Sequence, residues 1–294
     1  MIKNNIINSK SYDELTIADD FMFYKVMSDE ELCKELLETI LDIKIEKLVY
    51  HETQAVLKDS YDGKGIRLDI YAADENKNVY NIEMQALDSG ELEKRSRYYQ
   101  SCIDMDLLDK GVRYKYLNKS IVIFICTFDM FKKDLLKYTF SNRCNEDKDI
   151  VLDDGLTKVF VNASYRGNEL TSNNKKLLNL IKYISTGVVT DEYTKKLDEA
   201  VISSRKRKSW RNEYMKYRAD REDLLDMGLE QGLEMGLELG REEGLSLGRE
   251  EERTKLIENM LSLDMPYEQI AKIVDVPVEE IYHYVEKKEN VIIQ

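Results

Sequence analysis

The sequence predicts an α/β protein with a mixed central sheet and flanking helices, followed by a helical C-terminal tail. Three observations support this fold class. Two segments of alternating residues flank a short polar loop, as in a β-hairpin. The nearly continuous apolar segment SIVIFICTF, residues 120–128, is typical of a strand buried at the centre of a sheet. Segments with apolar residues at helical spacing precede, separate and follow these strands.

The first elements are expected between residues 19 and 85. Residues 19–41 should form helix, with Ser28 as the N-cap of the second segment. Residues 44–57 are mixed in character and should contain a strand. Residues 66–72 (IRLDIYA) and 79–85 (VYNIEMQ) should form the two strands of the hairpin, because both alternate in residue type around the loop ADENKN.

The remaining elements complete the sheet. Residues 91–110 should form a helix closed by Gly111, because glycine readily adopts the left-handed conformation that ends helices. The buried strand follows, and residues 158–162 (KVFVN) are expected to form another strand. Residues 172–186 and 191–227 are expected to be mainly helical. This order of elements predicts a mixed sheet with a crossover helix.

Composition divides the chain into four parts. Residues 1–190 hold the expected sheet, and residues 191–227 form a long helical segment with a basic cluster. Residues 228–253 form a glycine-rich acidic connector, expected to be flexible and partly helical because each internal glycine costs a helix roughly 1 kcal/mol. Residues 254–294 should form three short helices resembling a helix-turn-helix unit. Its acidic last helix favours docking to protein over reading DNA.

The net charge of −13 at pH 7 lies almost entirely in the tail. Residues 1–219 carry 36 Lys and Arg against 37 Asp and Glu, whereas residues 220–294 carry 8 against 20. A near-neutral body can still hold a basic groove for an anionic substrate. We expect a cytoplasmic protein without membrane segments, because no apolar run approaches the length of a membrane span and no secretory signal is apparent. The four cysteines have no paired spacing, which disfavours disulfides and zinc ribbons.

The chain has only two histidines, His51 and His283. This excludes metal centres rich in histidine and disfavours Ser-His-Asp or Cys-His catalysis, both of which need a well-placed imidazole. An enzyme of this composition would therefore work through carboxylates. Carboxylates prefer a hard cation such as magnesium.

The hairpin places one carboxylate on the polar face of each strand. Side chains two residues apart share a face, so Asp69 lies with Arg67, and Glu83 lies with Asn81 and Gln85. With ADENKN as the loop, Asp69 falls opposite or next to Glu83, with Cβ atoms about 4.5–5.5 Å apart. Carboxylates this close repel each other unless a cation lies between them, and a divalent ion would fit. A solvated hairpin face whose acids pair with nearby Lys or Arg remains the alternative.

The segment RLDIYAADENKNVYNIEMQ resembles the core of the PD-(D/E)XK nucleases, in which Asp, a hairpin turn and Glu-x-Lys form the site. It is most similar to the recombination-promoting nuclease (Rpn) and transposase family. That family also has an N-terminal DxxFxxx segment, here residues 20–27, and an RSxYY helix, here residues 95–99. A glycine-rich acidic tail is frequent in it. The resemblance covers roughly residues 15–260.

The resemblance implies a restriction-endonuclease-like fold and metal-dependent DNA cleavage linked to recombination or transposition. Asp69 and Glu83 would bind Mg²⁺, with Mn²⁺ or Ca²⁺ as alternatives, together with the backbone carbonyl of Met84. Asp20 would be a further acidic group at the site, although acids at a helix start are commonly only partners of the helix dipole. The alternative function is a catalytically weak or inactive nuclease-fold module that binds DNA or protein, and a third is a transcription regulator acting through residues 254–294.

Gln85 stands where the wider superfamily usually has lysine. A neutral amide can orient water by hydrogen bonds but supplies no positive charge. Either Gln85 suffices for the reaction, or a cation comes from another residue. The candidates are Arg67 in the hairpin and Lys94, Arg95 or Arg97 on the following helix. The candidate DNA contacts are Arg67, Arg95, Arg97 and Tyr99, with Arg205, Lys206, Arg207 and Lys208 of the basic cluster RKRKSWR. The expected partners are DNA and further copies of the chain, the latter through the C-terminal helical tail.

Overall fold

The computed structural model describes residues 10–57, 66–167 and 175–292. The chain forms two compact units, residues 1–218 and residues 219–294. The first unit contains a six-stranded mixed sheet with helices beside it, which confirms the predicted fold class. Among the described residues, no helix combines the length and the apolar character needed to cross a membrane.

The sheet has the strand order β1-β2-β3-β4-β6-β5. β1, β2 and β3 are antiparallel, β3, β4 and β6 are parallel, and β5 pairs antiparallel with β6 at the edge. The strands are β1 (Leu48–Leu57), β2 (Ile66–Asp74), β3 (Val79–Gln85), β4 (Ser120–Cys126), β5 (Lys137–Phe140) and β6 (Leu156–Asn162). The predicted strands are confirmed, and β5 is an addition, since four residues at an edge carry too little alternation to be recognised.

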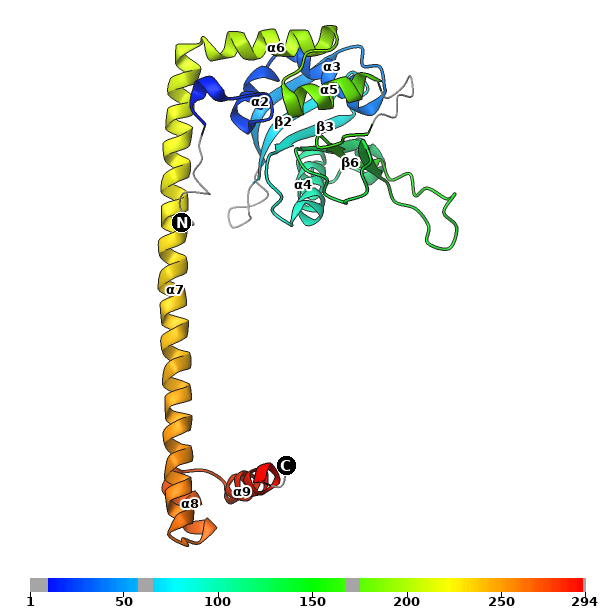
Figure 1. Ribbon diagram of the computed structural model, residues 1–294. Helices are drawn as coiled ribbons and strands as arrows, with labels where there is room; N and C mark the ends of the chain where they lie inside the picture. The colour runs from blue at the N-terminus through cyan, green and yellow to red at the C-terminus, as the bar shows by residue number, and fades with distance from the viewer. Residues whose placement is uncertain (1–9, 58–65, 168–174, 293–294) are drawn as a thin grey trace. The chain divides into compact units, whose positions relative to one another are not determined.

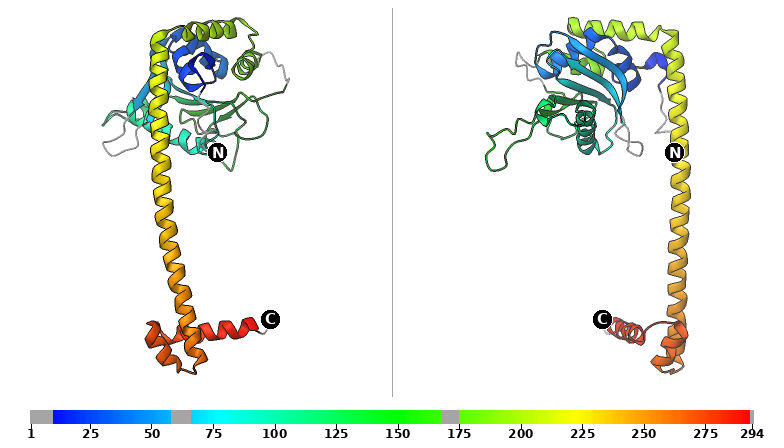
Figure 2. Two further views of the ribbon diagram at one scale, coloured as in Figure 1. Left: turned by 60° about the vertical axis from the view of Figure 1, so that its left-hand side comes forward. Right: turned by 180° about the vertical axis from the view of Figure 1, so that it is seen from behind.

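Helices cover both faces of the sheet (Figures 1 and 2). On one face Leu180 and Leu197 share a buried cluster with Ile123 of β4, and on the other face Ile103 shares a second cluster with Phe124. β4 is thus buried on both sides, as its apolar sequence predicts. The first face carries α2 (Asp20–Val26), α3 (Glu30–Leu41), α5 (Lys175–Thr186) and α6 (Glu192–Arg205), and the second carries α4 (Leu92–Leu107).

The alternation along β2 changes at Asp69. The sequence pattern predicts Leu68 on the face of Ile70, but Leu68 packs in the cluster beside α4 and Ile70 packs in the opposite cluster. Gln54, which pairs with Asp69 across β1 and β2, has a positive φ of 59°. The register of β1 and β2 stays one-to-one across this point, so the side chains change faces through a local change of backbone conformation and not through an inserted residue.

Two predicted helix ends are displaced by a few residues. α3 is capped by Asp29, whose carboxylate accepts hydrogen bonds from two amides of the first turn, and not by Ser28. Both residue types are favoured N-caps, so composition alone does not separate them. α4 ends at Leu107, and Gly111 adopts a φ of 89° in the turn beyond the helix.

The segment 191–227 is not one helix. α6 ends at Arg205, and α7 (Lys208–Ser262) begins after a short turn. α7 then continues without a break through the glycine-rich segment, contrary to the expected partly helical connector (Figure 1). The residues between the glycines are mostly Leu, Glu, Met and Arg, which lose little conformational freedom in a helix and offset the cost of each glycine.

The C-terminal residues form the expected group of three short amphipathic segments. The end of α7 packs with α8 (Tyr267–Val274) and α9 (Val278–Ile292) around a small core that includes Ile270 and Ile281. α8 ends at Asp275 in a left-handed conformation, with φ of 54°. The first of the three expected short helices is the end of α7, and the helix-turn-helix-like character of this group and its role stay predictions.

One buried carboxylate organises the turn between β2 and β3. Asp74 is 3% exposed and accepts hydrogen bonds from the backbone amides of Asn76 and Asn78 at 2.9 and 2.8 Å. It also accepts from the Asn78 side chain and the Tyr80 hydroxyl, both at 2.8 Å. The turn that sets the register of the two strands therefore depends on this side chain.

Replacing Asp74 with alanine should lower the free energy of unfolding by about 2–4 kcal/mol, because four donors lose their acceptor in a buried place. Chemical denaturation would measure the change. Glu93→Ala, which removes an exposed acid on α4, is a suitable control and should change stability by less than about 0.5 kcal/mol. A variant as stable as the wild type would show that the turn does not depend on Asp74.

Candidate active site

The structure brings the two predicted carboxylates together. The ladder between β2 and β3 runs from Ala73 and Val79 to Ile70 and Ile82, and Asp69 and Glu83 are the next residues along the two strands. The amide of Asp69 donates to Glu83 Oε1 at 3.2 Å, and the amide of Met84 donates to Asp69 Oδ2 at 3.2 Å. Each carboxylate is therefore held by the backbone of the other strand.

Burial gives this pair unusual acid–base properties. Glu83 is 1% exposed, and its burial, followed by the nearby charge of Asp69, raises its pKa to about 8. Burial also raises the pKa of Asp69, to about 6. A low-dielectric environment disfavours two adjacent negative charges, so the site favours either a bound proton or a cation.

A cation of the protein itself contacts the pair. Arg95, near the start of α4, donates from Nη2 to Glu83 Oε2 at 3.0 Å and from Nη1 to Gln85 Oε1 at 3.2 Å. Its Nε donates to the Tyr99 hydroxyl at 2.8 Å. The guanidinium also lies over the rings of Tyr99 and Phe124, with distances of 5.1 and 5.7 Å to the ring centroids. Arg95 is thus fixed on several sides while it compensates the charge of Glu83.

Two further side chains act on Asp69. Gln54 Nε2 donates to Asp69 Oδ1 at 3.3 Å. Asp20 contributes through its charge, which helps to raise the pKa of Asp69. Its own carboxylate accepts a hydrogen bond from the Tyr217 hydroxyl at 2.6 Å and another from the Phe21 amide at 2.7 Å. The predicted acidic residue at the start of α2 therefore lies near the pair but is engaged by other donors.

Asn81 is a site residue that the sequence analysis did not select. It lies two residues before Glu83 on β3 and is fully buried. Its side-chain amide lies close enough to Glu83 to lower the pKa of that carboxyl, but within the described residues neither its nitrogen nor its oxygen has a partner at full hydrogen-bond geometry. Buried polar atoms normally have partners, so an orphaned amide beside the carboxylates indicates a place for water or a ligand. Its position on the polar face of the strand was the available signal. Gln54 gave no such signal, because its positive φ cannot be read from sequence.

The donor set fits one divalent ion with water completing its shell. Within the described ranges, no three His, Cys, Asp or Glu side chains converge closely enough to hold a metal by themselves. Magnesium commonly uses one or two protein carboxylates and retains several waters. Asp69 and Glu83, with the Met84 carbonyl as a third oxygen donor, would hold such an ion.

The other predicted residues near the pair have different surroundings. Arg67 is exposed, and its charge lowers the pKa of Asp69, although less strongly than burial raises it. Arg97 is exposed on α4. Tyr99, expected at a DNA-binding surface, is only 8% exposed and stacks on Phe124. Its structural role is to support Arg95, because its hydroxyl and its ring both contact that side chain.

The basic cluster lies at the turn between α6 and α7. Arg205 donates from Nε and Nη2 to the Leu15 carbonyl at 3.0 and 2.6 Å, so much of its guanidinium is used within the fold. Arg207 and Lys25 both lie over the ring of Trp210, at 4.2 and 5.3 Å from its centroid, so cations of the fold already contact this ring. Lys206 and Lys208 are exposed. The structure thus presents part of the predicted cluster to solvent and uses the rest for packing.

Comparison with known proteins identifies the family. The family model described as PD-(D/E)XK nuclease family transposase matches residues 17–228, well over half of the chain. No curated protein and no solved structure gives a match. The matched residues include the hairpin with Asp69 and Glu83, the helix with Arg95, and the basic cluster. The chain therefore belongs to the PD-(D/E)XK nuclease family of transposases, in agreement with the resemblance of its hairpin sequence.

Proposed function

We propose that the protein is a divalent-metal-dependent DNA endonuclease, acting in recombination or transposition. The observation that carries this proposal is the convergence of the Asp69 and Glu83 carboxylates on adjacent strands, in a buried place where both pKa values are raised. Burying two acids together is costly unless a cation compensates them. Because the chain belongs to a nuclease family, we infer that the compensating cation is a metal ion used in catalysis.

The proposed reaction is hydrolysis of a phosphodiester. The oxygen of a water adds to phosphorus, one P–O ester bond breaks, and the leaving oxygen takes up a proton. A bound divalent ion, Mg²⁺ by preference and Mn²⁺ or Ca²⁺ as alternatives, supplies activation of the water and stabilisation of phosphoryl charge. Asp69 and Glu83 would bind this ion. The Met84 amide and the Gln54 side chain orient Asp69, and Asn81 offers an amide to water beside the two carboxylates.

DNA is the proposed substrate because of the nuclease family and the exposed cations of the first unit. Arg67 on β2 and Arg97 on α4 are exposed, and Lys206 and Lys208 add positive charge at the turn between α6 and α7. Such cations neutralise backbone phosphates without reading sequence. Binding should therefore weaken steeply as salt concentration increases.

Replacing either carboxylate with its amide should abolish cleavage. Asp69→Asn and Glu83→Gln retain the size of the side chain and remove its charge, so each should reduce magnesium-dependent nicking of plasmid DNA by about 100-fold or more. Asp106→Asn, which changes an exposed acid on α4, is the matched control. Nicking by both site variants at the wild-type rate would rule out this site. The assay should include Mg²⁺, Mn²⁺ and Ca²⁺ with chelator controls.

The raised pKa values predict how stability depends on pH when no metal is bound. A carboxyl group whose pKa is raised by folding contributes full stability below its unfolded pKa and loses it as pH rises through the folded pKa. In chelator, the wild type should therefore lose stability between roughly pH 4 and pH 8, the range set by the unfolded values and the folded pKa of Glu83 at about 8. The Glu83→Gln variant should lose less folding stability over the same pH range.

Thermal unfolding of both proteins across this range would test that prediction. At pH 8 to 9 Glu83→Gln should be the more stable by roughly 2–4 kcal/mol, and the difference should shrink toward pH 4. Added Mg²⁺ should stabilise the wild type more at high pH, because ligands bind metal in their deprotonated form. Parallel pH profiles for the two proteins would contradict the burial of an ionisable Glu83.

A catalytically weak or inactive module that binds DNA or protein is the second candidate. The observation in its favour is that Arg95 already pairs with Glu83, at 3.0 Å. An arginine on both carboxylates would support this reading more strongly, but Asp69 is held by an amide side chain and a backbone N–H. Metal-dependent nicking that disappears in Asp69→Asn would decide against it.

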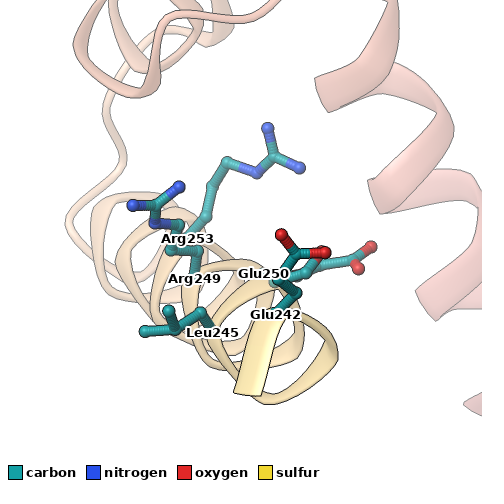
Figure 3. Close-up of a pocket in the computed structure, with 6 residues that line it drawn as sticks. Glu242, Leu245, Arg249, Glu250 and Arg253 are labelled. Atoms are coloured by element: carbon teal, nitrogen blue, oxygen red, sulfur yellow. The ribbon is translucent and has the colours of Figure 1, made fainter. Parts of the chain in front are cut away.

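The tail is the proposed site of self-association. Along α7 the side chains of Leu229, Leu233 and Leu237 are 56%, 65% and 67% exposed. A shallow hollow further along the same helix is formed by Glu242, Leu245, Ser246, Arg249, Glu250 and Arg253, with the two arginines projecting to one side and the two glutamates to the other (Figure 3). Exposed leucines between charges of both signs are typical of helices that pair with other helices.

Light scattering on the full chain would test self-association. Wild type should form a dimer or larger assembly, and changing Leu229, Leu233 and Leu237 together to glutamine should shift it toward monomer, because the apolar contact is lost. The exposed residue Leu87 of the first unit provides a control, Leu87→Gln, that should leave the mass unchanged. A monomeric wild type at micromolar concentration would refute this proposal.

A further inference from the structure

We propose that Arg95 supplies the positive charge that Gln85 lacks, and that Gln85 is the residue that seats it. A lysine at position 85 would bring its ammonium group to the site from β3. Here the cation comes from α4, and Gln85 holds it by accepting a hydrogen bond from Nη1 at 3.2 Å. This inference rests on the proposed nuclease function and assigns one residue pair within that site.

The geometry gives Arg95 a defined position. Its Nη2 reaches Glu83 Oε2 at 3.0 Å while Nη1 reaches Gln85, so the planar fork of the guanidinium spans the two side chains of β3. Glu83 and Gln85 are two residues apart and share a face of the strand. A cation held between them lies beside the predicted metal ligand, where a lysine side chain from position 85 would also reach.

The support behind Arg95 restricts its motion. Tyr99 and Phe124 are stacked with a centroid separation of 6.2 Å, and the guanidinium lies over both rings. The Tyr99 hydroxyl accepts from Nε at 2.8 Å, which fixes the third nitrogen. The Arg95 side chain is still 32% exposed, so part of it remains open to a substrate.

The other candidate cations lack these contacts. Arg97 lies two residues after Arg95, so it projects about 200° away around α4 and is exposed. Arg67 is also exposed, and it acts on Asp69 through its charge. Arg95 contacts both a predicted metal ligand and the residue at the lysine position.

The chemical consequence is a change of partner during the reaction. Without substrate, Arg95 compensates the buried charge of Glu83. With a phosphodiester in the site, Nη2 can donate to a non-bridging oxygen of the phosphate in place of Glu83, while Nη1 stays on Gln85 and Nε on Tyr99. Gln85 keeps the guanidinium in place through this exchange because its side-chain oxygen accepts from Nη1, a different nitrogen from the one that leaves Glu83.

The test first removes the guanidinium of Arg95 on α4 and then introduces a lysine at position 85 on β3. Arg95→Gln should reduce single-turnover cleavage by about 100-fold. Its affinity for duplex DNA in chelator should change by less than about threefold, because one of several phosphate contacts is lost. The double variant Arg95→Gln with Gln85→Lys should regain at least about tenfold of the lost rate. Lys110→Gln, which removes an exposed cation beyond α4, is the control.

Thermal unfolding in chelator gives a readout independent of cleavage. Arg95→Gln should unfold at a lower temperature, because Glu83 loses its cationic partner, and the double variant should recover part of that loss. A purely structural role in packing against Tyr99 and Phe124 would not be restored by a lysine on β3. Recovery of both rate and stability therefore supports the pairing.

Two results would overturn the inference while leaving the proposed function intact. One is cleavage by Arg95→Gln at the wild-type rate, and the other is a folded double variant no faster than Arg95→Gln. If the wild type cleaves with none of the metals tested, the nuclease proposal fails and the catalytic role of Arg95 fails with it. The thermal measurements would then still show whether Arg95 compensates Glu83.

Discussion

The placement of a buried carboxylate, Glu83, beside the half-buried carboxylate of Asp69 is the constraint on which the rest of the site depends. Asp69 and Glu83 face each other across an antiparallel pair, and burial raises the pKa of both. The structure compensates them with the amides of the opposite strands and with Arg95. Each compensating group must be placed to within hydrogen-bond distance, so the surrounding fold has to be rigid.

That rigidity comes from the sheet and from α4. β4 lies between β3 and β6 and is buried on both faces, which fixes the strand that carries Glu83. α4 packs on the same face as the carboxylates through Ile103, and its first turns carry Arg95 and Tyr99. The chain thus uses the same apolar cluster to support the sheet and to bring the cation to the acids.

Much of this arrangement was predictable, because it depends on local patterns. The hairpin pattern predicted that Asp69 and Glu83 would lie close together on adjacent strands, and the apolar segment predicted a central strand. The exceptions depend on contacts that sequence patterns do not encode. The left-handed backbone of Gln54 moves Leu68 to the other face, and the pairing of Arg95 with Gln85 joins a helix to a strand. In α7 the helix propensity of the residues between the glycines outweighs the destabilisation that each glycine causes, so the helix continues through the glycine-rich segment.

An arginine on the helix has a physical advantage over a lysine on the strand in this environment. Desolvation raises the pKa of Glu83, and the same desolvation would lower the pKa of a lysine and favour its neutral form. A guanidinium stays charged at every pH at which the protein is folded. In the proposed site the two tasks of the motif lysine would be divided, with the charge coming from Arg95 on α4 and its orientation from Gln85. The glutamine at this position is then consistent with an active site, provided that the helix is held where Arg95 can reach it.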